Sequence, residues 1–262
     1  MTPGPLHGLR ILVTRPARQA GPLCDLIRVA GGEPVRLPAL AIEPPRDTAA
    51  ARRIVARLTD FDLAIFISPN ASEQGLTLIG QHGGLPPSVT VAAVGERTAE
   101  VLVQSGAHVD ITAPPPFNSE ALLTRPEFQS LAGRRVVIFR GEGGREHLAE
   151  TLRARGATVS YAEVYRRVAP DADLSAVIGG PDEVNVIVVT SAEALYNLLA
   201  MAEACGRRAW LLNRQLAVIS ERLARRAAEL GFEHPALVAA QAGDQGLIDA
   251  IAAWRVGAQA AQ

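Results

Sequence analysis

The sequence predicts an α/β protein made of two similar α/β units with parallel sheets. Three observations predict it. Short apolar runs alternate with amphipathic runs along almost the whole chain, the apolar runs are rich in Val and Ile, and three segments of the first half recur in the second. Alternating strand and helix patterns are typical of parallel sheets with helices on their faces. The 262 residues, 48% of them hydrophobic, are enough for two domains of ordinary size.

Six apolar runs of four to six residues, each bounded by a charged or small polar residue, are expected to form buried strands. They lie at residues 10–15, 62–68, 90–95, 135–140, 184–191 and 216–220. Helical patterns come between them, such as residues 18–32, whose apolar side chains recur every three or four positions before two glycines end the run. The last residues, 255–262, are expected to fray.

The second half of the chain repeats the first at a spacing of 123 to 125 residues. The three matched pairs of segments occur in the same order, and they set Arg15 against Arg140, Ser68 against Ser191 and Gly95-Glu96-Arg97 against Ser220-Glu221-Arg222. A solenoid would repeat every 20 to 50 residues. This longer period therefore predicts two similar units, with a cleft between them as the default binding site.

Two equivalent segments, 36–45 and 162–170, are expected to connect the units. Prolines in both segments disfavour helix, so each is expected to be extended. We expect the two to pair as a two-stranded β-ladder that acts as a hinge. The spacing alone leaves open whether the first unit keeps its own opening strand.

Composition excludes several classes of function. The formal net charge is −1, which predicts no binding of nucleic acid. All 26 basic residues are arginine, so Schiff-base catalysis and the P-loop lysine are excluded. The five histidines lack the spacing of metal ligands, and we expect no metal.

The sequence also predicts a soluble, cytoplasmic protein. The two cysteines, Cys24 and Cys205, are typical of reduced thiols in the cytosol rather than of a disulfide framework. The opening MTPGPLHG lacks the charged and apolar regions of a signal peptide. No run approaches the ~20 apolar residues that span a membrane.

The stretch from Arg140 to Arg145, RGEGGR, follows a predicted strand and precedes a predicted helix. A dinucleotide fingerprint needs glycine where Glu146 stands, and a Walker A motif needs lysine, so a nucleotide is disfavoured. Two interpretations stay open. Backbone amides at Gly141 and Gly144, together with Arg140 or Arg145, bind a carboxylate or another anion. Alternatively, the glycines only form a tight turn and the arginines are solvated.

Polar side chains also follow two other predicted strands. Ser68 and Asn70 come directly after one strand, and Thr190 and Ser191 come after another. Ligands of open α/β sheets bind at this carboxyl edge, whereas Ser and Thr are also preferred helix N-caps. Neither serine stands in a G-x-S-x-G motif, so a serine hydrolase is disfavoured.

Tyr165 is one of three tyrosines in the chain. It lies in a predicted connecting segment, where its hydroxyl group could face the cleft or its ring could pack on the sheet.

The chain resembles the uroporphyrinogen-III synthases over about Leu9 to Ala252. Nine motifs in order carry the resemblance: ILVTRP, PALAIEP, ISPNA, AVGERTAEVL, SEALL, RGEGGREHLAETLRARGA, VYRRVAP, VTSAEAL and DQGLIDAI. The resemblance implies two α/β domains joined by a two-stranded ladder. It further implies that the opening strand packs with the C-terminal half, so that one domain is 1–39 plus 168–262 and the other is 40–167.

The resemblance implies a lyase of tetrapyrrole biosynthesis that works without a metal or an organic cofactor. Its substrate would be hydroxymethylbilane, a linear tetrapyrrole with an acetate and a propionate on each ring. Loss of the hydroxymethyl oxygen as water would give an azafulvene, which closes through a spiro intermediate with inversion of the terminal ring. A small-molecule substrate, a monomer, and no nucleic-acid or membrane partner are expected.

The resemblance also implies roles for individual residues. Tyr165 matches the tyrosine thought to assist departure of the hydroxyl group. Cleft-lining positions of the family are matched by Ser68, Gly95, Thr98 and Ser191. Ser220-Glu221-Arg222-Leu223 replaces a turn that is Gly-Pro-Thr-Thr in many relatives, and Ser220 is the substitute candidate there. The substrate-binding candidates are Arg15, Ser68, Asn70, Gly95, Thr98, Arg140, Gly141, Gly144, Arg145, Thr190, Ser191 and Ser220.

Two rival functions stay open. A non-catalytic tetrapyrrole- or anion-binding regulatory module would keep the cleft and lose turnover, and the altered turn at Ser220 favours it. A two-domain binding protein of periplasmic type would need a signal peptide.

Overall fold

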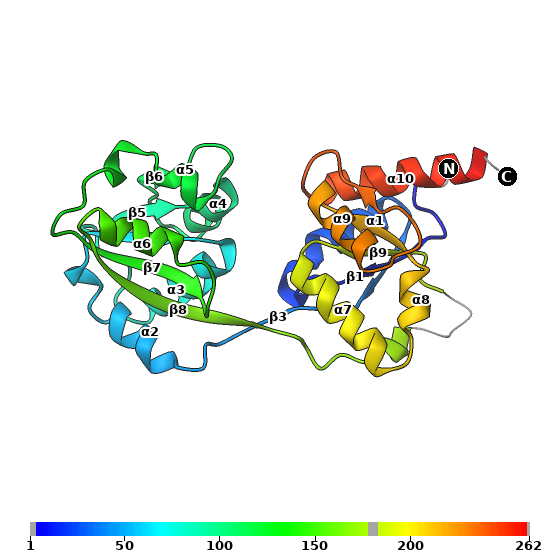
Figure 1. Ribbon diagram of the computed structural model, residues 1–262, viewed down its shortest axis with the longest axis horizontal. Helices are drawn as coiled ribbons and strands as arrows, with labels where there is room; N and C mark the ends of the chain where they lie inside the picture. The colour runs from blue at the N-terminus through cyan, green and yellow to red at the C-terminus, as the bar shows by residue number, and fades with distance from the viewer. Residues whose placement is uncertain (1–3, 178–182, 261–262) are drawn as a thin grey trace. The chain divides into compact units, whose positions relative to one another are not determined.

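The computed structural model describes residues 4–177 and 183–260, and the chain divides into two compact units (Figure 1). The terminal unit comprises Met1–Ala41 and Val168–Gln262, and the inserted unit comprises Ile42–Arg167. Each unit contains its own sheet. Two α/β units built on sheets of mostly parallel strands are the fold class that the sequence predicts.

The sheet of the terminal unit has the strand order β11-β10-β9-β1-β2, and every neighbouring pair is parallel. The opening strand β1 therefore lies beside β9, a strand from the second half of the chain. The strands are β1 (Arg10–Val13), β2 (Glu33–Arg36), β9 (Val186–Val189), β10 (Gln215–Val218) and β11 (Leu237–Val238).

Helices cover both faces of this sheet. Side chains of α7, α8 and α9 pack on the face that contains Leu12, and side chains of α1 and α10 pack on the face that contains Ile11 and Val13. Burial on both faces explains why Ile11, Leu12 and Val13 of β1 are all apolar. The helices are α1 (Gly21–Val29), α7 (Ala192–Ala204), α8 (Arg208–Leu212), α9 (Glu221–Glu229) and α10 (Asp244–Ala260), with short 3₁₀ helices at Ala17–Gln19 and Leu174–Val177.

The end of the chain departs from the prediction. Residues 255–260 continue helix α10 and are not frayed, while 261–262 lie outside the described residues. Leu247, Ile248 and Ile251 anchor this helix in the core. Because propagation adds one hydrogen bond for each residue fixed, an anchored helix extends readily through a segment that contains alanine and glutamine.

The inserted unit has the strand order β3-β8-β7-β4-β5-β6. Its strands from β4 to β8 pair in parallel. The strands are β3 (Ala41–Glu43), β4 (Leu63–Phe66), β5 (Thr90–Ala93), β6 (Ile111–Thr112), β7 (Arg135–Gly141) and β8 (Thr158–Val168).

Two apolar cores lie on the two faces of this sheet. One contains side chains of α2, α3 and α4, and Phe66 and Phe139 stack within it with ring centroids 4.5 Å apart. The other contains side chains of α5 and α6. The helices are α2 (Thr48–Val55), α3 (Pro69–Gly80), α4 (Glu96–Gln104), α5 (Ser119–Leu122) and α6 (His147–Ala154), with 3₁₀ helices at Leu58–Asp60 and Pro126–Phe128.

The two sheets share one topology. The order β11-β10-β9-β1-β2 corresponds position by position to β6-β5-β4-β7-β8, and β3 is an additional edge strand beside β8. The repeat in the sequence pairs the same elements, since it matches β1, α1 and β2 with β7, α6 and β8. The predicted duplication is thus confirmed in the strand order.

Strands β3 and β8 are neighbours, as expected of the two connecting segments. Arg166 on β8 forms an ion pair with Glu43 on β3 at 2.6 Å, and its Nε donates to the carbonyl oxygen of Pro44 at 3.2 Å. A side-chain clamp therefore reinforces the pairing of these strands.

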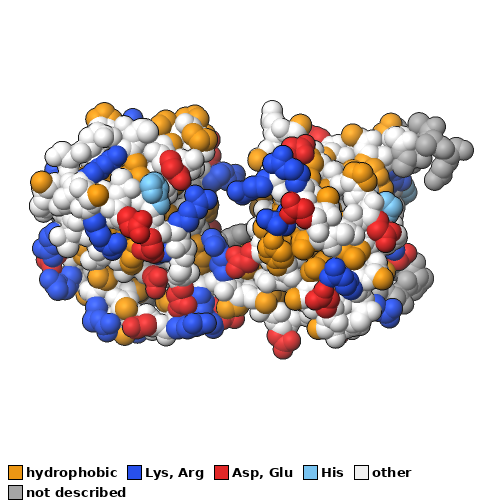
Figure 2. All heavy atoms as spheres, viewed as in Figure 1, with side chains coloured by type: hydrophobic (Ala, Val, Ile, Leu, Met, Phe, Trp, Pro, Cys, Tyr) orange, Lys and Arg blue, Asp and Glu red, His pale blue; other side chains and the backbone are white. Residues whose placement is uncertain are grey.

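Acidic and basic side chains are interspersed over the face of each unit that Figure 2 shows, in keeping with the formal net charge of −1. Within the described ranges, no helix combines the length and the apolar character needed to cross a membrane.

Candidate functional site

Each sheet has one point at which the strand order reverses. In the inserted unit it lies between β4 and β7, and in the terminal unit it lies between β9 and β1. Loops leave the carboxyl ends of neighbouring strands in opposite directions there, which opens a crevice where ligands of open α/β sheets bind. Ser68 follows β4 and Gly141 ends β7, while Thr190 and Ser191 follow β9. Sequence-predicted residues therefore flank both switch points.

A β-bulge orients Tyr165 in the inserted unit. Side chains of β8 alternate between the two faces of the sheet, so Tyr161 and Val164 pack in different cores. The same alternation would place Tyr165 on the face of Tyr161. A register shift opposite Arg140 and Gly141 reverses this, and Tyr165 packs in the same core as Val164. Bulges re-aim side chains in this way near functional sites.

The hydroxyl group of Tyr165 has two polar neighbours. It lies 3.2 Å from the Ser68 Oγ, and the Arg167 Nη2 donates to it at 3.3 Å. The tyrosine is 2% exposed, so its ring is packed while its hydroxyl group is hydrogen-bonded. Both interpretations of Tyr165, packing and a polar role, are thus compatible with its position.

Ser68 fulfils its predicted role as a helix N-cap, while its ligand role stays a prediction. Its Oγ accepts a hydrogen bond from the Ala71 backbone N–H at 3.1 Å and caps helix α3, while it also contacts Tyr165. Asn70 lies half-buried in the first turn of the same helix. The N-terminus of α3 and the tyrosine hydroxyl group therefore meet at Ser68.

Gly141 permits the close approach of Tyr165. A Cβ at position 141 would lie 2.8 Å from the Tyr165 Cε2 and Cζ and 3.2 Å from its hydroxyl oxygen. The Tyr165 carbonyl oxygen in turn accepts from the Glu142 N–H at 2.8 Å. Position 141 thus requires glycine because the tyrosine ring occupies the space of a side chain.

The Arg140 side chain stabilises the glycine turn after β7 by hydrogen bonds to its backbone. This side chain is 3% exposed, and its guanidinium donates to Glu146 at 2.9 Å, to the Gly141 carbonyl oxygen at 3.3 Å and to the Gly143 carbonyl oxygen. Gly144 has a φ of +106°, and a Cβ there would lie 2.9 Å from the Arg140 Nη2.

Of the two interpretations left open for this turn, the one with solvated arginines is wrong for Arg140, whose side chain is buried. The reason is that the turn folds its own carbonyl oxygens around the guanidinium. Arg145, in contrast, has an 81% exposed side chain and an ion pair with Glu120 at 3.3 Å. A ligand-binding role for Arg140, Gly141, Gly144 and Arg145 stays a prediction.

Glu146 and Tyr161 also contact the Arg140 side chain. The Tyr161 hydroxyl group donates to Glu146, and this hydrogen bond, followed by the one from Arg140, lowers the pKa of the Glu146 carboxyl group. Burial, and then the hydrogen bond to Glu146, raises the pKa of Tyr161. The Arg140 Cζ lies 4.6 Å from the centroid of the Tyr161 ring. At neutral pH the carboxylate and the guanidinium are therefore both charged and paired.

Gly95 and Thr98 lie where β5 leads into α4. Gly95 is the N-cap of α4 and has an extended backbone. Thr98 is 3% exposed in the first turn of this helix, and the Ser72 Oγ donates to its carbonyl oxygen at 3.4 Å. Thr98 thus supports the packing of α4 on α3 from a buried position.

In the terminal unit, a cavity of about 440 Å³ opens at the carboxyl ends of β9 and β10. Three of the predicted residues, Thr190, Ser191 and Ser220, line it. The Ser191 Oγ caps α7 by accepting from the Ala194 N–H at 3.1 Å, and the Ser220 Oγ caps α9 by accepting from the Leu223 N–H at 3.4 Å. Two helix N-termini therefore border one cavity, an arrangement that favours anions.

Arginines of α9 line the same cavity, and the sequence reasoning missed them. Arg226 pairs with Glu229 at 2.7 Å. Among the described residues, neither Arg222 nor Arg225 has an acidic partner within ion-pair distance. Arg222 occupies the first turn of α9, where the helix dipole disfavours positive charge. That misplaced charge, visible in Ser220-Glu221-Arg222, is the signal that could have identified it.

Arg15 lies at the end of β1, beside the switch point of the terminal unit. It forms an ion pair with Asp244 at 2.6 Å, at the first residue of α10. Both side chains are mostly buried, with exposed fractions of 17% and 23%. The structure thus ties Arg15 to α10 and leaves its predicted ligand role untested.

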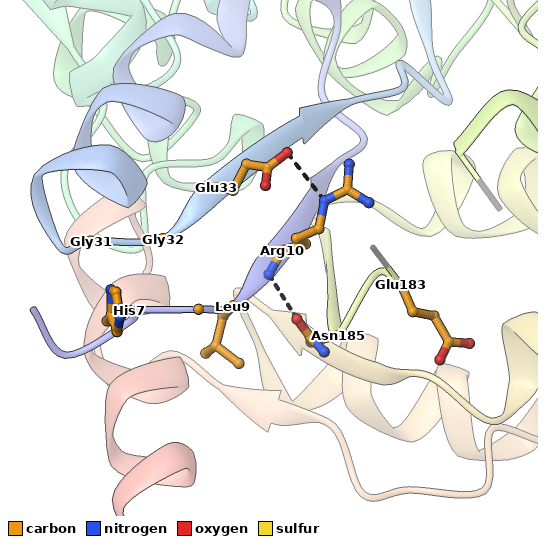
Figure 3. Close-up of a pocket in the computed structure, with 9 residues that line it drawn as sticks. His7, Leu9, Arg10, Gly31, Gly32, Glu33, Glu183 and Asn185 are labelled. Atoms are coloured by element: carbon orange, nitrogen blue, oxygen red, sulfur yellow. Dashed lines mark hydrogen bonds and ion pairs between the residues drawn. The ribbon is translucent and has the colours of Figure 1, made fainter. Parts of the chain in front are cut away.

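A cavity of about 580 Å³ lies at the opposite, amino edge of the same sheet (Figure 3). Arg10 lies in it, with its Nε bonded to Glu33 at 3.1 Å and its backbone N–H bonded to Asn185 at 2.7 Å. Glu183 also lines it, but its carboxylate points away from Arg10 and pairs with Arg214 at 2.9 Å.

No group of three or more His, Cys, Asp and Glu side chains in the described ranges could hold a metal ion.

Comparisons with known proteins agree with one another. A family model described as Uroporphyrinogen-III synthase HemD matches residues 22–249. The uroporphyrinogen-III synthase of Salmonella typhimurium is 36% identical over 235 residues, which cover 86% of this chain and 93% of the relative. That of Escherichia coli is 34% identical over 228 residues, with the same coverage.

Solved structures of similar fold have the same description. A mutant uroporphyrinogen III synthase from the extremely thermophilic bacterium Thermus thermophilus superimposes with a TM-score of 0.60 at 18% identity, covering 96% of this chain and 99% of that one. Uroporphyrinogen-III synthetase from Helicobacter pylori gives a TM-score of 0.58 at 17% identity, covering 92% and 97%. At these identities the likeness concerns the fold.

Proposed function

The chain belongs to the uroporphyrinogen-III synthase family, and from that premise we propose which of its residues carry the reaction. The enzyme cyclises hydroxymethylbilane with inversion of the terminal ring and release of water, and so forms uroporphyrinogen III for tetrapyrrole biosynthesis. The substrate carries carboxylates on every ring, so the residues must hold many negative charges and also assist the loss of one hydroxyl group.

We propose that Tyr165 is the proton donor. Its hydroxyl group gives a proton to the hydroxymethyl oxygen as the C–O bond breaks, water departs, and the pyrrole nitrogen supplies the electron pair that forms the azafulvene. The proton is restored when the terminal ring loses its own α-hydrogen on re-closure. Ser68 and Arg167, at 3.2 and 3.3 Å from this hydroxyl group, orient it. Their contact with Tyr165 at the carboxyl edge of the sheet is the observation that carries this assignment.

In the terminal unit, Thr190, Ser191 and Ser220 bind substrate carboxylates with the N-termini of α7 and α9. Arg222 and Arg225 add two positive charges to the lining of the same cavity. Charge-assisted hydrogen bonds from guanidinium to carboxylate are about twice as strong as neutral ones. This cavity is therefore the part of the terminal unit to which we assign binding of substrate carboxylates.

Control of geometry is the main catalytic task. Hydroxymethylbilane also closes without inversion to the symmetric isomer I, so the protein must hold the substituted carbon of the last ring over the azafulvene. Exclusion of water protects the reactive intermediate from hydrolysis. Residues that fix the substrate by its carboxylates accomplish both.

We further propose that the enzyme acts in the cytoplasm as a monomer and needs neither a metal nor an organic cofactor. Cys24 and Cys205 are free thiols, which is typical of a reducing compartment. Light scattering on the purified protein should give the mass of one chain.

The experiment that tests the function is an isomer analysis. Purified protein is mixed with fresh hydroxymethylbilane, the products are oxidised, and the porphyrins are separated. Isomer III should predominate and its share should rise with enzyme concentration, in the presence of chelator and without added nucleotide. Isomer I alone, from folded protein that binds the substrate, would instead indicate the non-catalytic binding module.

A further inference from the structure

A cavity of about 570 Å³ lies at the amino edge of the inserted unit's sheet, opposite the edge that carries Ser68 and Tyr165. It opens where β7 and β8 begin and where α2 ends. Six of its lining residues carry polar or aromatic groups: Arg53, Arg57, Phe61, Arg135, Thr158 and Ser160. A volume of this size is in the usual range of small-molecule sites, roughly 300–1,000 Å³.

The cavity has an excess of positive charge. Three arginines line it, and its lining contains no carboxylate. One carboxylate, Asp60, serves both Arg57 at 2.8 Å and Arg135 at 3.2 Å. The hydrogen bond from Arg57 lowers the pKa of Asp60, so this carboxylate is charged at neutral pH. Its single negative charge is shared between two arginines.

The third arginine is the least neutralised. Arg53 lies 3.8 Å from Asp47, and its side chain is 70% exposed. The Asp47 carboxylate also accepts from the Ala50 N–H at 2.9 Å as the N-cap of α2. Arg53 therefore has donors available for an incoming anion.

The rest of the lining suits a ring. The Arg135 guanidinium lies 5.7 Å from the centroid of the Phe61 ring, which together with Ile54 gives the cavity an apolar wall. Thr158 and Ser160 are two positions apart on β8, so both hydroxyl groups are on one face of the sheet. Guanidinium groups, hydroxyl groups and an aromatic edge thus surround one space.

We propose that this cavity is a second binding site of the protein, for a small organic anion that combines one flat ring with two carboxylates. The arginines pair with the carboxylates, the ring packs against Phe61 and Ile54, and the two hydroxyl groups complete the hydrogen bonds. The site lies at the edge of the sheet opposite to Tyr165, so its ligand does not compete for the residues to which we assign the reaction.

Isophthalate, a benzene ring with two carboxylates, is a suitable probe. Calorimetry on the full-length protein should detect binding that weakens as salt is raised, and backbone NMR shifts should change at Arg135 and Thr158 rather than at Ser68 and Ser191. Arg53→Gln should weaken binding about tenfold, as expected for loss of one charge-assisted pair. Arg28→Gln, which removes another exposed arginine with an i,i+3 ion pair, should leave it unchanged.

The proposal is overturned by the absence of binding, by shifts confined to Ser68 or Ser191, or by equal affinity in Arg53→Gln. Inorganic phosphate tests the ring requirement, because phosphate that binds as tightly as isophthalate would contradict a role for Phe61 and Ile54. Thr158→Val preserves β propensity and gives a second variant that should weaken binding without affecting the fold.

Discussion

Replacing Gly141 by alanine tests whether the placement of Tyr165 governs turnover. The new Cβ would lie 2.8 Å from two ring atoms, whereas ordinary contact begins at 3.4 Å, so the ring must move by about 0.6 Å. A shift of this size away from the Ser68 Oγ would lengthen their 3.2 Å contact beyond hydrogen-bond distance. Because misplacement by about 1 Å can cost 10²-fold in rate, we expect Gly141→Ala to lower kcat between about tenfold and 100-fold.

The same crowding should reduce stability. Overpacking a well-packed core typically costs about 1–3 kcal/mol, which lowers the Tm of a domain of this size by roughly 3 to 10 °C. Gly80→Ala is the matched control, because its Cβ would meet nothing within 4 Å. Gly80 lies at the end of helix α3, so alanine there should leave kcat unchanged and raise stability slightly.

A double variant separates the tyrosine from direct contact of Gly141 with the substrate. If the alanine acts through the hydroxyl group, then adding it to Tyr165→Phe should cause little further loss of kcat. The measurement is the initial rate of isomer III formation for all four proteins. Wild-type kcat in Gly141→Ala, or a loss that multiplies in full in the Tyr165→Phe background, would refute the reasoning.

Three further predictions concern single side chains. Tyr165→Phe should lower kcat on the order of 10²-fold with little change in Tm, whereas Tyr196→Phe, on an exposed ring, should retain full activity. Arg222→Gln should raise KM about threefold to tenfold and leave kcat unchanged, because it removes one carboxylate contact; an unchanged KM would exclude that contact. Glu146 has a lowered pKa, so its contribution to stability is present above the unfolded pKa of about 4.3 and is lost as pH falls through the folded value. Urea midpoints measured between pH 6 and about pH 3 should thus fall less steeply in Glu146→Gln than in the wild type.

The strands and their repetition were predictable because burial on both faces leaves a simple pattern. Residues 10–15, 62–68 and 135–140 each contain an apolar run with polar residues at its ends, and each forms a parallel strand with helices on both faces. The repeat in the sequence also predicted that the two sheets would share one topology. Such features depend on local composition and spacing, which a sequence displays directly.

The environment of individual side chains was not predictable in the same way. The bulge that turns Tyr165 into the core depends on the register between β7 and β8, which no local pattern specifies. Arg140 directly precedes a turn with three glycines and resembles a solvated turn residue, yet contacts with Glu146 and two carbonyl oxygens bury it. Arg222 was overlooked although an arginine in the first turn of a helix is itself unusual.

The duplication explains why the two switch points have similar scaffolds and different chemistry. Ser68 and Ser191 occupy equivalent positions, and each caps the helix that follows the central strand of its sheet. The position equivalent to Tyr165 in the other half of the repeat is Leu40, which is 9% exposed and has no group that could donate a proton. Ser220 and Arg222 correspond to Gly95 and Arg97, but Arg97 lies 3.7 Å from Glu100 whereas Arg222 has no acidic partner among the described residues. One copy therefore contains the tyrosine, and the other contains an arginine without an acidic partner among the described residues. This difference is expected if the inserted unit assists loss of the hydroxyl group and the terminal unit binds carboxylates.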